Sequence, residues 1–293
     1  MKATHALVVI AALSIVASTS AVAQRRPAPP KSVRLYVFDC GTLEGGDPAR
    51  FSLKREEMAV ADMSVACYLI AHPKGTLVWD AGAVPDGDIK SEAAPNRYRI
   101  VLPNGNERFV TTTRTLKSQM AAAGYAPGEI NFLALSHYHY DHTANANLFA
   151  GATWLVRQVE RDVMFPEKPN ELTQPATYSA LRTSKTIIVK TDDYDVFGDG
   201  TVVLKLTPGH TPGHQVLFVK LAKTGPVVIS GDLYHYPEER SLNRVPTFDV
   251  DPKQTAASRA SLDLFLKKAG AQLWIQHDLA ANAKMKKPPA YYD

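Results

Sequence analysis

The chain has 293 residues, 45% of them hydrophobic, and a formal net charge of +4. This apolar content supports a sizeable buried core, in one large domain or in two fused half-domains. The positive charge is too small and too scattered to argue for nucleic acid as a partner.

The first residues have the pattern of a signal peptide. A positive start at Met1-Lys2 precedes an apolar stretch from Ala6 to Val16, and Ala21-Val22-Ala23 is an Ala-x-Ala cleavage motif. The apolar stretch is too short for a transmembrane helix, and the cleavage point carries no cysteine for a lipid anchor. We therefore predict an exported protein, periplasmic or secreted, with a signal peptide over residues 1–23 and no stable membrane insertion after cleavage.

Strands and helices follow in an order typical of an α/β protein. Three early strands are predicted, over residues 33–38, 64–70 and 76–79. Residues 84–111 are rich in Gly, Pro, Asn and charge and are expected to form a long loop. Three helices are predicted after it, over residues 113–124, 157–164 and 255–269. The pattern indicates two β-sheets packed face to face, with helices outside and a site where strand-end loops converge.

Cys40 and Cys67, the two cysteines of the chain, lie near the first two strands. An oxidising compartment permits a disulfide between them. Cys67 also lies in the middle of a strand among apolar residues, so a buried free thiol is the alternative.

The most informative stretch is His137-Tyr138-His139-Tyr140-Asp141-His142, which follows the apolar run Phe132-Leu133-Ala134-Leu135. Such a run predicts a short buried strand, so the motif lies where a strand ends. Imidazole nitrogens and carboxylate oxygens are ligands that borderline divalent metals such as zinc prefer. Because neighbouring side chains diverge, the pattern favours two metals, with His137 and His139 on one and Asp141 and His142 on the other.

Three further strand ends carry metal-binding side chains. The segment Thr207-Pro208-Gly209-His210-Thr211-Pro212-Gly213-His214 has Pro-Gly turns that would fix a histidine after a strand. Asp232 ends the run Val227-Val228-Ile229-Ser230-Gly231, and His277 follows the last short strand. Together the four strand ends indicate metal-dependent hydrolysis.

This order of motifs resembles the metallo-β-lactamase superfamily of binuclear hydrolases, and most of all its N-acyl-homoserine lactonase branch. The likeness extends over nearly all of the chain after residue 33 and includes Gly75-Thr76-Leu77-Val78-Trp79-Asp80-Ala81-Gly82 and Gln276-His277-Asp278. It implies a four-layer αβ/βα sandwich of the metallo-β-lactamase type, in a hydrolase domain over residues 24–293. It also implies two divalent metal ions, most simply zinc, although iron, manganese or cobalt suit such ligands too.

The resemblance assigns the metal ligands position by position. One metal is expected on His137, His139 and His210. The second is expected on Asp141, His142 and His277, and Asp232 is expected to bridge the two. A hydroxide between the metals would attack the ester carbonyl. Asp80 is expected to orient a metal-binding histidine, and His214 to be a structural, hydrogen-bonded residue.

Two departures from the lactonase pattern bear on the substrate. After His142 the lactonases usually carry Ala-Gly-Gly-Asn, whereas this chain has Thr143-Ala144-Asn145-Ala146-Asn147, which adds bulk beside the second metal. The lactonases also place a tyrosine three residues after the bridging aspartate, where this chain has His235, flanked by Tyr234 and Tyr236. A histidine there could donate a hydrogen bond or shuttle a proton.

The predicted catalytic residues are the ligands Asp141 and Asp232, together with His235 and Tyr234. The predicted substrate is a small lactone or ester, in the first place an N-acyl-homoserine lactone, the substrate of quorum-quenching enzymes. Three loop regions, over residues 41–63, 84–111 and 165–186, are expected to determine substrate choice.

Other reactions are possible on the same site. The β-lactamases proper usually lack the last histidine of the motif, here His142, and glyoxalase-type thioester hydrolases usually have a Gly-His-Glu-like late motif where this chain has Gln276-His277-Asp278. Phosphotriester hydrolysis stays open, because the same hydroxide can attack phosphorus. A binding protein without metals is disfavoured because all seven ligands are present.

Overall fold

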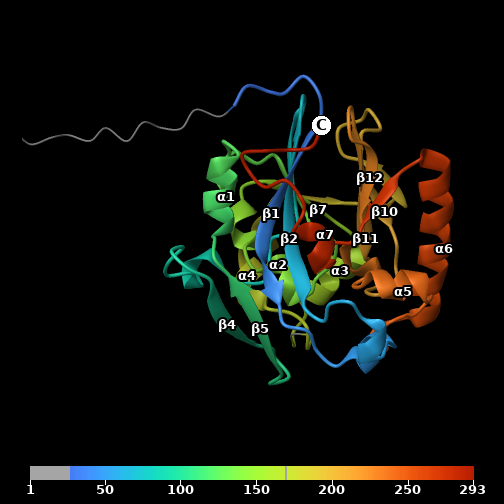
Figure 1. The fold of residues 1–293 in the computed structure, drawn as a ribbon. Coiled ribbons are helices and arrows are strands. Elements are labelled where there is room, and N and C mark those ends of the chain that lie inside the picture. Colours follow the sequence, from blue (N-terminus) through green and yellow to red (C-terminus); the bar gives the residue numbers. More distant parts are fainter. Residues whose placement is uncertain (1–26, 169) are drawn as a thin grey trace, which may run out of the picture.

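The computed structural model describes residues 27–168 and 170–293 (Figure 1). The predicted signal peptide, residues 1–23, lies outside these described residues. Among the described helices, none combines the length and the hydropathy that a membrane crossing requires.

The larger of two sheets has eight strands in the order β4-β5-β1-β2-β3-β6-β7-β8. They are β1 (Arg34–Leu43), β2 (Met63–His72), β3 (Gly75–Trp79), β4 (Asn96–Val101), β5 (Glu107–Thr112), β6 (Phe132–Ala134), β7 (Thr153–Val156) and β8 (Thr186–Ile188). The antiparallel β1, β2 and β3 bury most of their side chains, since both faces of the sheet are covered. From β3 to β8 the pairing is parallel, so the loops after β3 and β6 leave the sheet at one edge.

The smaller sheet has five strands in the order β13-β12-β11-β10-β9. They are β9 (Asp193–Asp195), β10 (Val202–Leu206), β11 (Gln215–Leu221), β12 (Gly225–Ile229) and β13 (Gln272–Trp274). The register places Leu204 opposite Leu217 and Leu217 opposite Ile229, which gives one apolar row across the sheet. Because β13 joins β12 in parallel, the residues after these two strands reach the same edge.

The described residues form seven α-helices, several of which cover the outer faces of the sheets. They are α1 (Leu116–Ala122), α2 (Tyr140–Thr143), α3 (Gln158–Met164), α4 (Pro175–Tyr178), α5 (Pro237–Ser241), α6 (Pro252–Ala269) and α7 (Leu279–Asn282). The 18-residue α6 begins after Asp251, whose carboxylate accepts the N–H groups of Lys253 and Gln254. It ends at Gly270, whose φ of 61° is the left-handed conformation that favours glycine.

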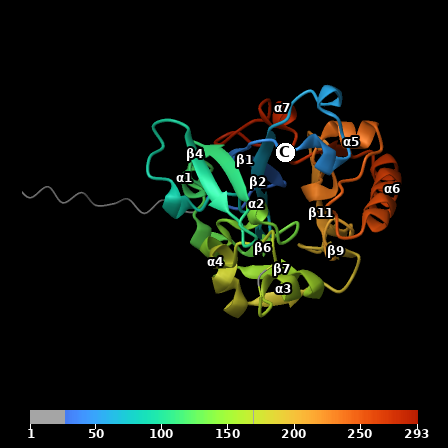
Figure 2. The same ribbon diagram turned by 90° about the horizontal axis from the view of Figure 1, so that it is seen from below.

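Figure 2 shows the layers from below, and three hydrophobic clusters hold them together. One lies between the sheets and includes Trp79 and Leu217. Another packs helices such as α1, through Met120, against the outer face of the larger sheet. The third packs α6, through Leu262, against the smaller sheet. This arrangement confirms the predicted four-layer αβ/βα sandwich.

Residues 84–111 differ from the predicted long loop, because they contain the hairpin of β4 and β5. Tyr98 pairs with Val110 and Arg99 with Phe109 within it. Only two register pairs, Thr42 with Thr111 and Leu43 with Val110, join the hairpin to β1, and it extends beyond the rest of the larger sheet (Figure 1). The side chains of β4 are exposed or half-buried, so its sequence lacks the apolar alternation that identifies a strand.

The predicted helices over residues 157–164 and 255–269 are confirmed, and the helix predicted over 113–124 is shorter, from Leu116 to Ala122. Thr115 caps it, because its hydroxyl accepts the N–H of Ser118 at 3.1 Å.

Of the two alternatives for the cysteines, the disulfide is present: Cys40 of β1 is bonded to Cys67 of β2, with 6.0 Å between their Cα atoms. The bond lies beside the irregular step in β1 between Asp39 and Thr42. A Cβ atom added at Gly82 would come within 3.4 Å of both sulfur atoms. The disulfide therefore contacts the turn that follows β3.

Removal of the disulfide should lower the free energy of unfolding by about 3 kcal/mol, since the bond closes a loop of sequence separation 27 in the unfolded chain. The Cys40→Ala, Cys67→Ala double variant should therefore unfold at a lower guanidinium concentration than the oxidised wild type. Wild type that is reduced while unfolded and refolded in reductant serves as the control and should match the variant. Equal midpoints for the variant and the oxidised protein would contradict the expectation.

Candidate metal centre

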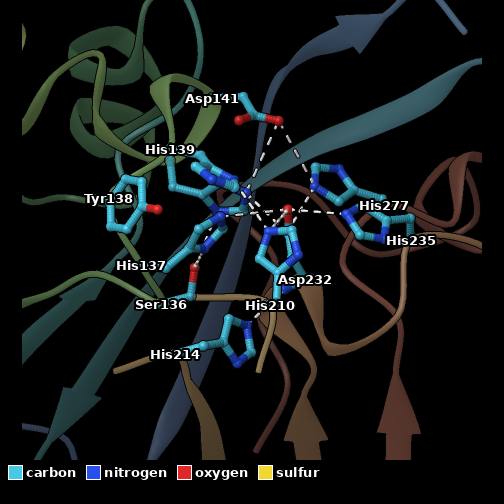
Figure 3. Close-up of polar contacts among 12 residues, drawn as sticks. Ser136, His137, Tyr138, His139, Asp141, His210, His214, Asp232, His235 and His277 are labelled. Carbon is cyan, nitrogen blue, oxygen red and sulfur yellow. Dashed lines mark hydrogen bonds and ion pairs between the residues drawn. The ribbon is translucent and has the colours of Figure 1, made fainter. Parts of the chain in front are cut away.

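All seven predicted ligands meet between the two sheets, at the edge where four strands end (Figure 3). The motif that follows β6 contributes four of them, the β10–β11 connection contributes His210, and the segments after β12 and β13 contribute Asp232 and His277. Ligand atoms of His137, His139, His210 and Asp232 lie within 4.8 Å of one another, and so do those of Asp141, His142 and His277. The structure thus forms the two neighbouring groups that the sequence predicts.

The carboxylate of Asp232 lies between these groups. Its Oδ1 is 2.9 Å from Nε2 of His142 and 3.0 Å from Nε2 of His277. Its Oδ2 is 3.3 Å from Nε2 of His210 and 3.5 Å from Nε2 of His137. Each oxygen therefore faces one group, which is the geometry of a carboxylate that bridges two cations.

The donor set fits divalent cations. Nε2 of His137 and Nε2 of His142 are buried without a hydrogen bond, although both point at Asp232. Burial, followed by the crowding of other imidazoles, lowers the pKa of His139 well below its usual value, so this ring is neutral. Burial opposes the charge of Asp232, but the surrounding imidazoles outweigh it and hold its pKa well below the usual range. A neutral imidazole such as His139 and an ionised carboxylate are the forms that bind zinc-like metals. At His142 and His210 burial opposes the charged form, but neighbouring carboxylates, Asp232 above all, outweigh it and raise the pKa of both rings.

Asp80 orients one of the ligands, as predicted. Its Oδ2 is 2.8 Å from Nδ1 of His142, and it also accepts the Ser136 hydroxyl at 2.9 Å and the Gln276 amide at 2.7 Å. The backbone of Asp80 has a φ of 57°, a strained value for a residue with a side chain. These contacts hold it there and leave Nε2 of His142 as the atom that faces Asp232.

Asp249 supports His210 in the same way, and the sequence analysis missed it. Its Oδ1 is 2.8 Å from Nδ1 of His210, and its Oδ2 accepts the Thr255 hydroxyl at 2.7 Å. Asp249 lies just before α6 in a segment without a motif, so the sequence alone carries no indication of this contact. On the opposite side, Nδ1 of His277 is 2.7 Å from the carbonyl oxygen of Ser64.

His214 is a structural residue, as expected. Its Nε2 accepts the backbone N–H of Asp232 at 3.0 Å, and its Nδ1 lies 3.1 Å from the carbonyl oxygen of Thr207. Burial lowers the pKa of His214 to about 3, which keeps the ring neutral. The side chain of His214 therefore positions Asp232 through the backbone of that residue.

A buried carboxylate, Glu160 of α3, connects the two principal motifs. It accepts the N–H of Tyr138 at 3.1 Å and the N–H of Gly213 at 2.7 Å. Burial raises the pKa of Glu160 to about 7 even with these donors. The sequence analysis did not identify this residue.

His235 and Tyr234 have different surroundings. Nε2 of His235 is 3.2 Å from Oδ2 of Asp232, and its Nδ1 is 3.2 Å from Glu239, which in turn pairs with Arg259 at 2.6 Å. Burial opposes the charge of His235, but the carboxylates of Glu239 and Asp232 raise its pKa to about 10.

Tyr234 has an extended backbone, with φ −143° and ψ 132°. Its side chain therefore points to the opposite side from that of His235 and packs with Leu262 and Leu266 of α6. The expected catalytic position of Tyr234 is thus corrected, because the residue lies outside the centre.

A cavity of about 330 Å³ opens beside the ligands. His139, Asp141, Asp232 and His235 form its floor, and Phe51, Phe109 and Leu172 are among its walls. These three apolar residues come from the three regions that the sequence predicts to determine substrate choice. The volume suits a small organic molecule.

The sequence pattern of the metallo-beta-lactamase superfamily matches residues 60–274, which contain six of the seven predicted ligands, and His277 follows just after the matched range. The chain belongs to this superfamily. Membership of the superfamily, together with the two His/Asp groups, confirms the prediction of a metal-dependent hydrolase.

Similar superfamily members include proteins named as lactonases. The N-acyl homoserine lactonase AttM of Azorhizobium caulinodans is 27% identical over 265 residues, which cover 89% of this chain and 99% of AttM. The N-acyl homoserine lactonase AiiA of Bacillus thuringiensis subsp. kurstaki is 25% identical over 236 residues, which cover 78% of this chain and 87% of AiiA. The names of these relatives therefore confirm the resemblance to the N-acyl-homoserine lactonase branch.

Solved structures show the same fold. An N-acyl homoserine lactone hydrolase with N-hexanoyl-L-homoserine bound at its catalytic metal centre aligns with a TM-score of 0.71 at 23% identity, over 89% of this chain and 99% of its own. AidC, a dizinc quorum-quenching lactonase, aligns with a TM-score of 0.59 at 20% identity, over 84% of this chain and 88% of its own.

The Asp249→Ala variant should bind zinc about 10- to 100-fold more weakly than the wild type, because Nδ1 of His210 loses the acceptor that orients the ring. Competition with a chromogenic chelator would measure the dissociation constant. Asp263→Ala, which removes an exposed carboxylate of α6 that pairs with Arg240, is the matched control. Equal zinc affinities for the two variants would count against a role of Asp249 in metal binding.

Proposed function

We propose that the chain hydrolyses lactones, with N-acyl homoserine lactones as substrates, through a two-metal centre. The observation that carries the proposal is the position of Asp232, whose two oxygens face two separate ligand groups. The names of the similar proteins support the choice of lactone, since AttM matches over nearly its entire length.

In this proposal, one metal is held by His137, His139 and His210. The other is held by Asp141, His142 and His277, and Asp232 bridges both. Zinc is the proposed metal, although the same nitrogen and oxygen donors also suit iron, manganese or cobalt. When bound, the two cations would supply Lewis acidity at the ester carbonyl and make hydroxide available near neutral pH.

The residues of the chain orient the substrate and handle the proton of the leaving group. The lactone ring would lie on the cavity floor, with Phe51 and Phe109 excluding water around it. Ring opening breaks the bond between the carbonyl carbon and the ring oxygen, which leaves as an alkoxide and needs a proton. His235 can supply that proton from Nε2, because Glu239 holds its Nδ1 and fixes the ring.

Export is part of the same proposal. The signal-peptide pattern over residues 1–23 supports it, and so does the Cys40–Cys67 disulfide, since disulfides persist in oxidising compartments.

Replacement of His235 by alanine should lower kcat about 100-fold or more, which is the usual contribution of a general acid, while the metal content stays the same. Steady-state kinetics and metal analysis of the same preparation would separate the two effects. A variant that loses metal but keeps its activity per bound metal would show that His235 has no part in the proton transfer.

Metal-loaded protein should open short- and long-chain N-acyl homoserine lactones faster than it hydrolyses a chromogenic β-lactam, a phosphotriester or a thioester. The chelated protein is the control and should be inactive on all of them. A preference for a different substrate of this panel would leave the superfamily membership intact and refute the lactonase assignment.

A further inference from the structure

Beyond the ligands, the cavity contains two arginines. Arg50 comes from the 3-10 helix Pro48–Phe51 that follows β1, and Arg108 comes from β5. Within the described part of the chain, neither guanidinium forms an ion pair with a carboxylate; Arg108 donates only to the carbonyl oxygen of Glu107. Partial burial of a charge without an ion-pair partner is costly, so an anionic ligand would stabilise both side chains.

The two glutamates of the cavity wall do not form ion pairs with Arg50 or Arg108. Glu44 accepts two hydrogen bonds from Arg97, at 2.5 and 2.9 Å. Glu107 is paired with Arg99. Asp47 accepts the backbone N–H of Ala49 at 3.0 Å, where it caps the 3-10 helix. Each of the two glutamates therefore has its own arginine, and Asp47 favours the charged form of Arg50 without forming an ion pair with it.

Arg50 is held close to the metal centre by an aromatic ring. Its guanidinium carbon is 4.8 Å from the centroid of the Phe248 ring. Phe248 in turn lies 5.8 Å from the ring of His210 and 5.5 Å from the ring of His235. The backbone carbonyl of Arg50 also accepts the N–H of Thr247 at 2.7 Å. A single ring therefore separates Arg50 from the ligands, and little entropy would be lost when it binds.

Arg50, Arg108 and Tyr140 line one cavity. Burial, followed by the charge of Arg108, lowers the pKa of Arg50 below its usual value, although Tyr140 and Asp47 act in the opposite direction. Tyr140 lines the same cavity and lies between the ligands His139 and Asp141 in the chain. Within the described residues its phenol oxygen has no hydrogen-bond partner, so it is a further donor for an anionic group.

We propose that the natural substrate is an anionic lactone, whose carboxylate, phosphate or similar group binds Arg50 and Arg108. A short spacer would join this group to the scissile carbonyl. This inference rests on the proposed lactonase function and deepens it. Guanidinium groups bind such anions through paired, charge-assisted hydrogen bonds. A neutral acyl chain would instead cover both guanidinium groups without giving them a partner.

Three homoserine lactones that differ only at the acyl end test the proposal. N-succinyl-homoserine lactone ends in a carboxylate, its succinamoyl analogue ends in a neutral carboxamide, and the 3-phosphonopropanoyl analogue ends in a phosphonate. For the wild type, kcat/KM should be at least tenfold higher for an anionic lactone than for the carboxamide, and the ratio should fall as salt is added. Whichever of the two anions gives the higher value identifies the preferred group.

The Arg50→Gln, Arg108→Gln double variant should lower the ratio of anionic to neutral kcat/KM at least tenfold. Arg114→Gln removes an exposed charge that follows β5 outside the cavity, and it should leave the ratio unchanged. A wild-type ratio near one, or a ratio that the double variant does not change, would overturn the proposal.

A binding measurement separates this inference from the lactonase assignment. If none of the three lactones is opened, the proposed function fails. Calorimetry with N-succinylglycine on chelator-treated protein then measures whether Arg50 and Arg108 bind an anion. A tenfold or greater loss of affinity in the double variant would support an anion site at Arg50 and Arg108. Equal affinity of wild type and double variant would refute it.

Discussion

The carboxylate of Asp232 is the point on which the rest of the structure depends. Five imidazoles, those of His137, His142, His210, His235 and His277, place Nε2 within 3.5 Å of its two oxygens. These rings come from connections in both sheets, so the charge can be accommodated only when the sheets are packed together. The parallel pairing of β12 with β13 and of β3 with β6 brings the necessary strand ends to that edge.

Around this carboxylate the imidazoles have acceptors on their outer sides. Asp80 holds His142, Asp249 holds His210, and Glu239 holds His235. An acceptor at Nδ1 fixes a proton on that atom and directs Nε2 inward, where a neutral ring offers a lone pair and the proposed acid His235 offers a proton. The centre is therefore preorganised by hydrogen bonds that extend one residue outward, to Thr255, Gln276 and Arg259.

The sequence alone was sufficient to predict the features that depend on a local pattern of residues. The motif from His137 to His142 and the strand ends before His210, Asp232 and His277 predicted the residues that the structure brings together and the layers that carry them, because buried strands are recognisable as apolar runs. Asp249 and Glu239 could not be identified, since each contacts its histidine only through the tertiary fold or the turn of a short helix. The hairpin of β4 and β5 was not predicted either, because an exposed edge strand needs no apolar face.

The hairpin of β4 and β5 helps to form the substrate cavity but takes no part in the metal centre. It contributes Arg108 and Phe109 to the cavity, yet it pairs with β1 through only two register positions and contributes none of the seven metal ligands. Substitution of its exposed residues would leave the ligand geometry intact, whereas Val110 of β5 is buried in the cluster on the outer face of the larger sheet. Divergence of substrate preference between relatives can therefore proceed in this peripheral segment while the hydrolytic centre is inherited unchanged.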